Sequence, residues 1–207
     1  MQHVMNGDPL KHRWLWLADS NGIANAANIW NRLNAGYTDG GRHYHNWAHI
    51  DDCLAKFDRL RELANDHLAV ELAIWFHDAI YDSRRSDNEE QSAVLAESCL
   101  RSLQSSDRVM EMIRGSSHAL PPKDHDGALL CDIDLSILGA ESARYDHYAK
   151  TIRKEYDWVN AVDYRAGRSK VLNSFLARSV IYSNPECSEL WEAEARTNIK
   201  RELDSLL

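Results

Sequence analysis

Several residue types and patterns are scarce in this chain of 207 residues, and each scarcity excludes a class of protein. The four cysteines, Cys53, Cys99, Cys131 and Cys187, are scattered and never form a CxxC pair. Their spacing excludes a zinc knuckle or a thioredoxin-like motif and predicts reduced thiols. No stretch approaches the roughly 18 to 20 uncharged apolar residues that span a bilayer, and no small-residue cleavage site follows the short apolar patch near the start. We therefore expect a cytoplasmic protein that does not cross a membrane.

Positive charge is scarce as well. The chain carries 24 lysines and arginines against 32 aspartates and glutamates, which gives a net charge of −8. Binding to duplex nucleic acid relies on neutralising many phosphates, so the composition argues against duplex nucleic acid as a partner. A small anionic substrate in a local basic pocket is compatible with this composition.

Only 4 prolines and 9 glycines interrupt the chain. Between them the apolar residues recur at spacings of three and four, which predicts helices, and no region shows the alternation of a β-strand. We expect an all-α helical bundle that forms one domain over residues 1–207, because this length favours a single core. The expected helices are about 9–19, 23–36, 45–64, 67–82, 87–104, 107–118, 129–138, 141–160, 163–180 and 187–206, with irregular loops at 35–41 and 119–127.

Polar residues interrupt the apolar pattern at three places. The first is the segment YHNWAH, in which His45 and His49 lie four residues apart where a helix is expected to begin. In a helix this spacing places both imidazoles on one face. The second is AIWFHDAIYD, where His77 and Asp78 lie within an apolar stretch that predicts a buried helix. A buried carboxylate is costly unless it is paired or bound to a cation, so Asp78 requires positive charge nearby.

The third interruption is the segment LCDIDLSIL, which contains Asp132 and Asp134. Residues two apart on a helix point about 200° apart, so only one of these carboxylates easily faces a common site. We favour Asp134 for that site and interpret Asp132 as a helix cap.

The order of these residues resembles the HD superfamily of metal-dependent phosphohydrolases, and the run RHYHN, WFHDAIYD, NEEQSA, DIDLSILG and IRKEY is similar to a bacterial group of predicted HD phosphohydrolases over most of the chain. The resemblance implies an all-helical HD domain and a divalent metal held by four ligands. These ligands are His49, His77, Asp78 and Asp134. The YHNxxH and DIDLS segments also resemble those of the cyclic-nucleotide phosphodiesterases, which implies that His45 is the proton donor. In those enzymes a second histidine follows the HD pair by four residues, whereas this sequence has Tyr81-Asp82 in that neighbourhood.

The resemblance implies hydrolysis of a phosphate ester, such as a nucleotide or a related small phosphorylated molecule, by a metal-bound water. Two imidazoles and two carboxylates suit Mn²⁺, Fe²⁺, Co²⁺, Ni²⁺ or Zn²⁺ and, with more waters, Mg²⁺, and this ligand set does not select one ion. A cationic imidazole beside the metal would protonate the departing alkoxide, and the ordinary pKa of a histidine allows His45 both protonation states in the cell.

Further candidates for substrate or second-metal contacts are His118, Arg42, Asp132, Glu89 and Tyr156. His118 either binds a second ion or the substrate, or interacts with the dipole at a helix end. Glu89 is interpreted as part of a charged first turn, with the orientation of a ligand histidine as the less favoured alternative. Tyr156 and Tyr164 face either the pocket or the core. The candidate phosphate ligands are Arg42, Arg114, Lys123, Arg153 and Arg168, of which only Arg42 has a positional argument, since it precedes His45 by three residues.

Three other functions are compatible with these residues. A nucleotide sensor without turnover would share the same metal ligands. A di-iron oxygenase would need further ligands, for which His118 and Asp82 are the obvious suppliers. A purely structural role for the polar clusters would predict no metal at all.

Overall fold

The computed structural model describes residues 9–118 and 120–206, which form ten α-helices and two short 3-10 helices and contain no strand. The α-helices are α1 (Pro9–Ser20), α2 (Ala26–Tyr37), α3 (Trp47–Leu60), α4 (His67–Phe76), α5 (Asn88–Leu100), α6 (Ser106–Gly115), α7 (His125–Asp134), α8 (Ser142–Glu155), α9 (Ala161–Leu176) and α10 (Pro185–Leu206). The 3-10 helices are η1 (Arg61–Leu63) and η2 (Leu135–Gly139). The all-α prediction is confirmed.

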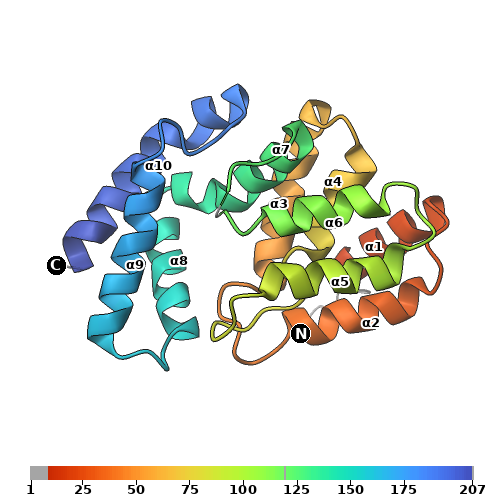
Figure 1. Ribbon diagram of the computed structural model, residues 1–207, viewed down its shortest axis with the longest axis horizontal. Coiled ribbons are helices and arrows are strands. Elements are labelled where there is room, and N and C mark those ends of the chain that lie inside the picture. Colours follow the sequence, from red (N-terminus) through yellow and green to blue (C-terminus); the bar gives the residue numbers. More distant parts are fainter. Residues whose placement is uncertain (1–8, 119, 207) are drawn as a thin grey trace, which may run out of the picture.

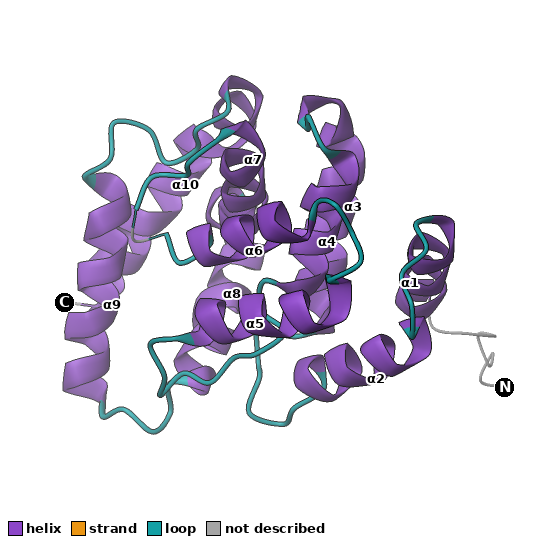
Figure 2. Ribbon diagram, turned by 45° about the vertical axis from the view of Figure 1, so that its right-hand side comes forward, coloured by secondary structure: helices purple, strands orange, loops and turns teal. Residues whose placement is uncertain are grey.

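Helix α4 lies at the centre of the helical assembly. Every residue from Ala69 to Phe76 is buried, and α4 packs against α3, α5, α6 and α7. Figure 2 shows α3 and α6 beside it. The sequence explains this position, because a helix that is apolar on all sides must be surrounded by other elements. The one acid among these residues, Glu71, is paired with Arg13 and Arg61.

The last three helices lie to one side of the molecule. Figure 1 shows α8, α9 and α10 on that side, α1 to α6 on the other, and α7 between them. The connection runs through η2, which packs against both α8 and α10. At Gly139, an added Cβ would lie 2.5 Å from the Cβ of Trp191, so only glycine allows η2 to approach α10 this closely.

Several predicted helix boundaries differ from the observed ones, and two of these differences fall at polar clusters. Helix α3 begins at Trp47, because the side chain of Asn46 accepts a hydrogen bond from the Ala48 N–H and caps the first turn. His45 therefore precedes the helix, and His45 and His49 do not share a helical face. Their ring centroids are still only 6.1 Å apart.

Helix α4 ends at Phe76, so the pair His77-Asp78 lies in the turn that follows and not inside a helix. Side chains from distant segments satisfy the backbone here. Arg42 donates to the carbonyls of Asp78 and Ala79. The Ser92 hydroxyl accepts from the N–H of Ile80 and donates to its carbonyl. These tertiary bonds replace those that would have continued the helix.

Helix α7 begins at His125, earlier than predicted, because Asp124 accepts a hydrogen bond from the Gly127 N–H at 2.8 Å. The predicted loop at 119–127 is thus partly helical, and Ala119 lies outside the described residues. Asp132 and Asp134 consequently fall in the last turn of α7 instead of near its start.

Candidate metal centre

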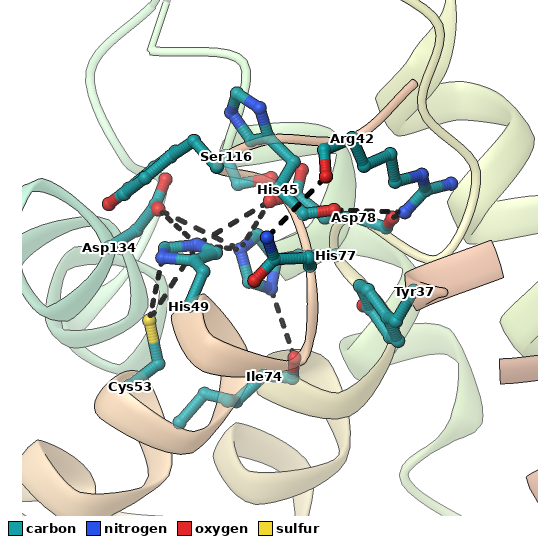
Figure 3. Close-up of polar contacts among 12 residues, drawn as sticks. Tyr37, Arg42, His45, His49, Cys53, Ile74, His77, Asp78, Ser116 and Asp134 are labelled. Atoms are coloured by element: carbon teal, nitrogen blue, oxygen red, sulfur yellow. Dashed lines mark hydrogen bonds and ion pairs between the residues drawn. The ribbon is translucent and has the colours of Figure 1, made fainter. Parts of the chain in front are cut away.

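Four side chains from three segments lie close together near the start of α3 and the ends of α4 and α7 (Figure 3). His49 comes from the first turn of α3, His77 and Asp78 from the turn after α4, and Asp134 from the end of α7. The Nε2 atom of His49 lies 3.2 Å from Nε2 of His77, 3.5 Å from Asp78 Oδ2 and 3.1 Å from Asp134 Oδ1. The Nε2 atom of His77 lies 3.2 Å from Asp78 and 3.7 Å from Asp134. The structure therefore brings together the four residues predicted as ligands.

The donor set fits a divalent metal ion. Metal–nitrogen bonds of about 2.1 Å at angles of about 90–110° place two nitrogen ligands about 3.0–3.4 Å apart. The separation of 3.2 Å between the two Nε2 atoms falls within this range. Nδ1 of His77 lies 3.0 Å from the Ile74 carbonyl, which can only accept a hydrogen bond, so Nδ1 carries the proton and Nε2 is left to bind an ion.

The electrostatics of the cluster also favour a cation. Burial alone would raise the pKa of Asp78 and of Asp134, but the neighbouring histidines outweigh it and hold both pKa values well below the usual range. Burial would lower the pKa of His49 and of His77, and the surrounding acidic groups raise both instead. Two ionised carboxylates in a partly buried place need positive charge beside them.

Cys53 adds a thiol beside the ring of His49. It is buried one turn further along α3, with Sγ 3.7 Å from Nδ1 and 3.8 Å from Nε2 of His49. His49, His77 and Asp78 form one group that could hold a metal ion, and His49, Cys53 and Asp134 form another. Cys53 was not predicted here, although its spacing of four from His49 was a visible signal.

His118 lies against the same cluster from the loop after α6. Its Nε2 atom is 2.7 Å from Asp134 Oδ2, and its carbonyl accepts a hydrogen bond from Arg178 at 2.7 Å. Its φ of 56° is in the left-handed region, which a residue with a side chain adopts at some cost. Burial would lower the pKa of His118, but the bond to Asp134 raises it to about 10. His118 is thus a neighbour of a predicted ligand and not a surface residue at a helix end.

His45 stands beside the cluster and is held by Glu155. Its Nδ1 lies 2.6 Å from Glu155 Oε2, while Oε1 accepts from the N–H groups of Tyr44 and His45 at 2.7 and 2.9 Å. The ring of Tyr81 stacks on the imidazole, with 3.9 Å between the two ring centroids. Burial would raise the pKa of Glu155, yet its hydrogen bond with His45 outweighs this and lowers it. Glu155 was missed as a site residue, although it lies in the IRKEY segment.

Arg42 has a different position from the one predicted for a phosphate ligand. Its Nη1 donates to the carbonyls of Asp78 and His45 at 2.6 and 3.3 Å, and its Nη2 donates to that of Ala79 at 3.0 Å. Gly36 leaves room for this contact, since a Cβ there would lie 2.4 Å from the Ala79 oxygen. Arg42 therefore joins the loop of His45 to the turn of His77-Asp78, a positioning role.

Asp132 turns away from the cluster. Its carboxylate accepts from the backbone N–H groups of Ser183 and Asn184 at 2.8 and 2.7 Å and from the Asn184 side chain at 2.8 Å. It therefore fixes the segment that leads into α10 and does not cap its own helix as expected. Burial raises its pKa.

The remaining candidates lie apart from the four ligands. Glu89 is in the first turn of α5, and its side chain makes no hydrogen bond or ion pair within the described ranges. Asp82 accepts from the Arg84 N–H within its own loop, so the structure does not bring it to the cluster as a di-iron site would need. The other predicted phosphate ligands are all engaged: Arg114 pairs with Glu90, Lys123 with Glu111, Arg153 with the carbonyls of Tyr156 and Val159, and Arg168 with Glu202.

A cavity of about 530 Å³ opens beside the cluster. Asp134, His118 and His45 line one end of it, and Tyr156 and Tyr164 line its wall together with other aromatic rings. Both tyrosines thus face the pocket. A substrate group bound at the metal would extend into this cavity.

Comparisons with protein-family models, with curated proteins and with solved structures found no match. Within the described ranges, none of the helices is both long and apolar enough to cross a bilayer.

Proposed function

We propose that this protein is a metal-dependent phosphohydrolase of the HD type, acting on a phosphate ester such as a nucleotide. The observation that supports the proposal is the convergence of His49, His77, Asp78 and Asp134 from three distant segments, in the order that resembles that superfamily. A divalent ion bound there would polarise a phosphoryl oxygen and lower the pKa of a water molecule towards about 7.

His45 is the proton donor in this proposal. It does not belong to the ligand cluster, yet it lines the same cavity as Asp134. Glu155 fixes the Nδ1 edge of the ring, so that the Nε2 edge is free to deliver a proton to the leaving oxygen. Tyr81 and Glu155 together prevent the ring from turning away. His118, at Asp134, lies where it would contact the phosphate or a second ion.

The proposal is tested by loading the purified protein separately with Mn²⁺, Mg²⁺, Fe²⁺ and Ni²⁺ and screening phosphate monoesters, diesters and nucleotides for hydrolysis. We expect turnover with at least one ion and its loss on chelation. Replacing His77 and Asp78 with alanine should abolish metal binding measured by elemental analysis. Replacing His45 with glutamine should keep the metal and lower kcat by about 10²–10⁴-fold. His147→Ala, at an exposed position of α8, is the matched control.

The outcomes separate this function from its alternatives. Stoichiometric metal in the variant that lacks His77 and Asp78 would refute the ligand assignment. Tight nucleotide binding without release of phosphate would instead indicate a sensor. An iron-dependent optical spectrum with oxygen consumption would indicate an oxygenase.

A further inference from the structure

Six aromatic rings line the cavity away from the predicted metal ligands. They are Tyr81, Tyr148, Tyr156, Trp158, Tyr164 and Phe175. Such rings stack on planar organic groups and bury apolar surface, and they offer little to a hydrated anion. The volume of about 530 Å³ holds a group of the size of a nucleoside.

The same wall has no unpaired cation among the residues described. Apart from its two histidines, its charged side chains are Asp134, Asp163 and Arg168. Arg168 is nearly buried and donates to both carboxylate oxygens of Glu202 at 2.8 and 3.0 Å, so its charge is balanced. Asp163 adds a negative charge and accepts a hydrogen bond from Asn160 at 2.6 Å. A phosphate away from the metal would therefore have no countercharge.

Cationic side chains line a neighbouring cavity. This second cavity, of about 440 Å³, is lined by Arg84 and Lys154, and it shares Tyr81, Ser83 and Trp158 with the first. Two of the shared residues, Ser83 and Trp158, are fixed by hydrogen bonds. The Trp158 indole N–H donates to the Ser83 hydroxyl at 2.9 Å, which donates in turn to a backbone carbonyl of α8.

We infer that the substrate is a phosphate ester with a single phosphate group and an aromatic organic group, and that nucleoside polyphosphates are poor substrates. The single phosphate would be held at the end of the cavity that His45, His118 and Asp134 line, and the organic group would lie among the rings. Additional phosphates would face Asp163 and the aromatic wall, and this uncompensated charge weakens their binding. The inference rests on the proposed phosphohydrolase function.

The test uses the full chain loaded with its most active metal ion. Hydrolysis of a nucleoside monophosphate is compared with that of the triphosphate of the same nucleoside, with products separated by chromatography. Benzyl phosphate is compared with ethyl phosphate, since both release an alkoxide. We expect kcat/KM to be at least about tenfold higher for the monophosphate and for the benzyl ester. Equal or better hydrolysis of the triphosphate, or no preference for the benzyl ester, would overturn the inference.

A pair of variants on α9 tests the role of charge. Val171 lines the cavity and is 47% exposed, whereas Val162 is 66% exposed on the same helix and does not line it. Val171→Lys should raise the triphosphate-to-monophosphate ratio of kcat/KM by about two- to fivefold, and Val162→Lys should leave it unchanged. An unchanged ratio in folded Val171→Lys would contradict the inference. Failure to hydrolyse any ester with any ion would refute the proposed function as well, whereas efficient triphosphate hydrolysis would refute this inference alone.

Discussion

Replacing Glu155 with glutamine tests how His45 is held. The glutamine side chain has nearly the same shape, and its oxygen can still accept from the backbone N–H groups of Tyr44 and His45. What changes is the contact with Nδ1 of His45, now 2.6 Å from a charged oxygen. A hydrogen bond to an ionised group contributes about 1.5–3 kcal/mol, compared with about 1 kcal/mol between neutral groups. The variant therefore loses about 1–2 kcal/mol at this contact.

If this hydrogen bond orients His45 and stabilises its charged form in the transition state, its loss should lower kcat by about 5- to 30-fold, since 1.36 kcal/mol corresponds to about tenfold in rate. Metal content should not change, because Glu155 contacts none of the four ligands. The assay is steady-state hydrolysis of the best ester from the screen, together with elemental analysis of the same preparation. Wild-type kcat in Glu155→Gln, with normal metal content, would refute the role of Glu155 as a positioning residue.

Stability provides an independent check on the same variant. The folded-state pKa of Glu155 lies below its usual value of 4.5, so its ionised form stabilises the fold above that pH, and this contribution disappears as pH falls through the lower folded pKa. The free energy of unfolding of Glu155→Gln should therefore approach that of the wild type in acid. Urea denaturation at neutral and acidic pH measures this. Glu71→Gln is the matched control, because Glu71 is equally buried and salt-bridged but touches no site residue.

Three further variants test other contacts. Gly36→Ala should lower both the thermal stability and kcat, because the new Cβ would lie 2.4 Å from the Ala79 oxygen, next to the turn that contains His77 and Asp78. Thermal melting and steady-state kinetics measure these two effects. Asp132→Ala should cost about 2–4 kcal/mol of unfolding free energy in denaturant titrations, because it leaves the buried backbone and side-chain N–H groups of Asn184 without an acceptor, while the folded protein keeps its metal. Cys53→Ala should weaken metal binding by about tenfold in competition titrations, whereas Cys53→Ser should weaken it less, because serine keeps an acceptor near His49.

The fold class followed from the sequence because helical periodicity is a local property. The helices were found at nearly the right places, and errors occurred where tertiary contacts decide the local structure. The end of α4 depends on Arg42 and Ser92, which are remote in the chain, and no local pattern contains that information. Likewise, the start of α3 depends on a single cap at Asn46, a residue that lies inside the predicted helix 45–64.

The candidate site was predictable to a similar extent. The four predicted ligands stand out because acids and histidines interrupt apolar runs. The partner of His45 does not stand out, because Glu155 follows Lys154 near the end of an ordinary charged helix. The structural role of Arg42 does not stand out for a related reason. An arginine beside a predicted phosphate site suits both an anion and backbone carbonyls, and only the three-dimensional contacts distinguish these uses.

The origin of the ligands in segments far apart along the chain has a consequence for assembly. At least two of the helices α3, α4 and α7 must already be docked before any three of those side chains meet, so an unfolded chain offers an ion only few and weak donors. Such an ion would stabilise the folded bundle and would contribute little to the early steps of folding. The midpoint of thermal unfolding should accordingly rise with the concentration of free metal.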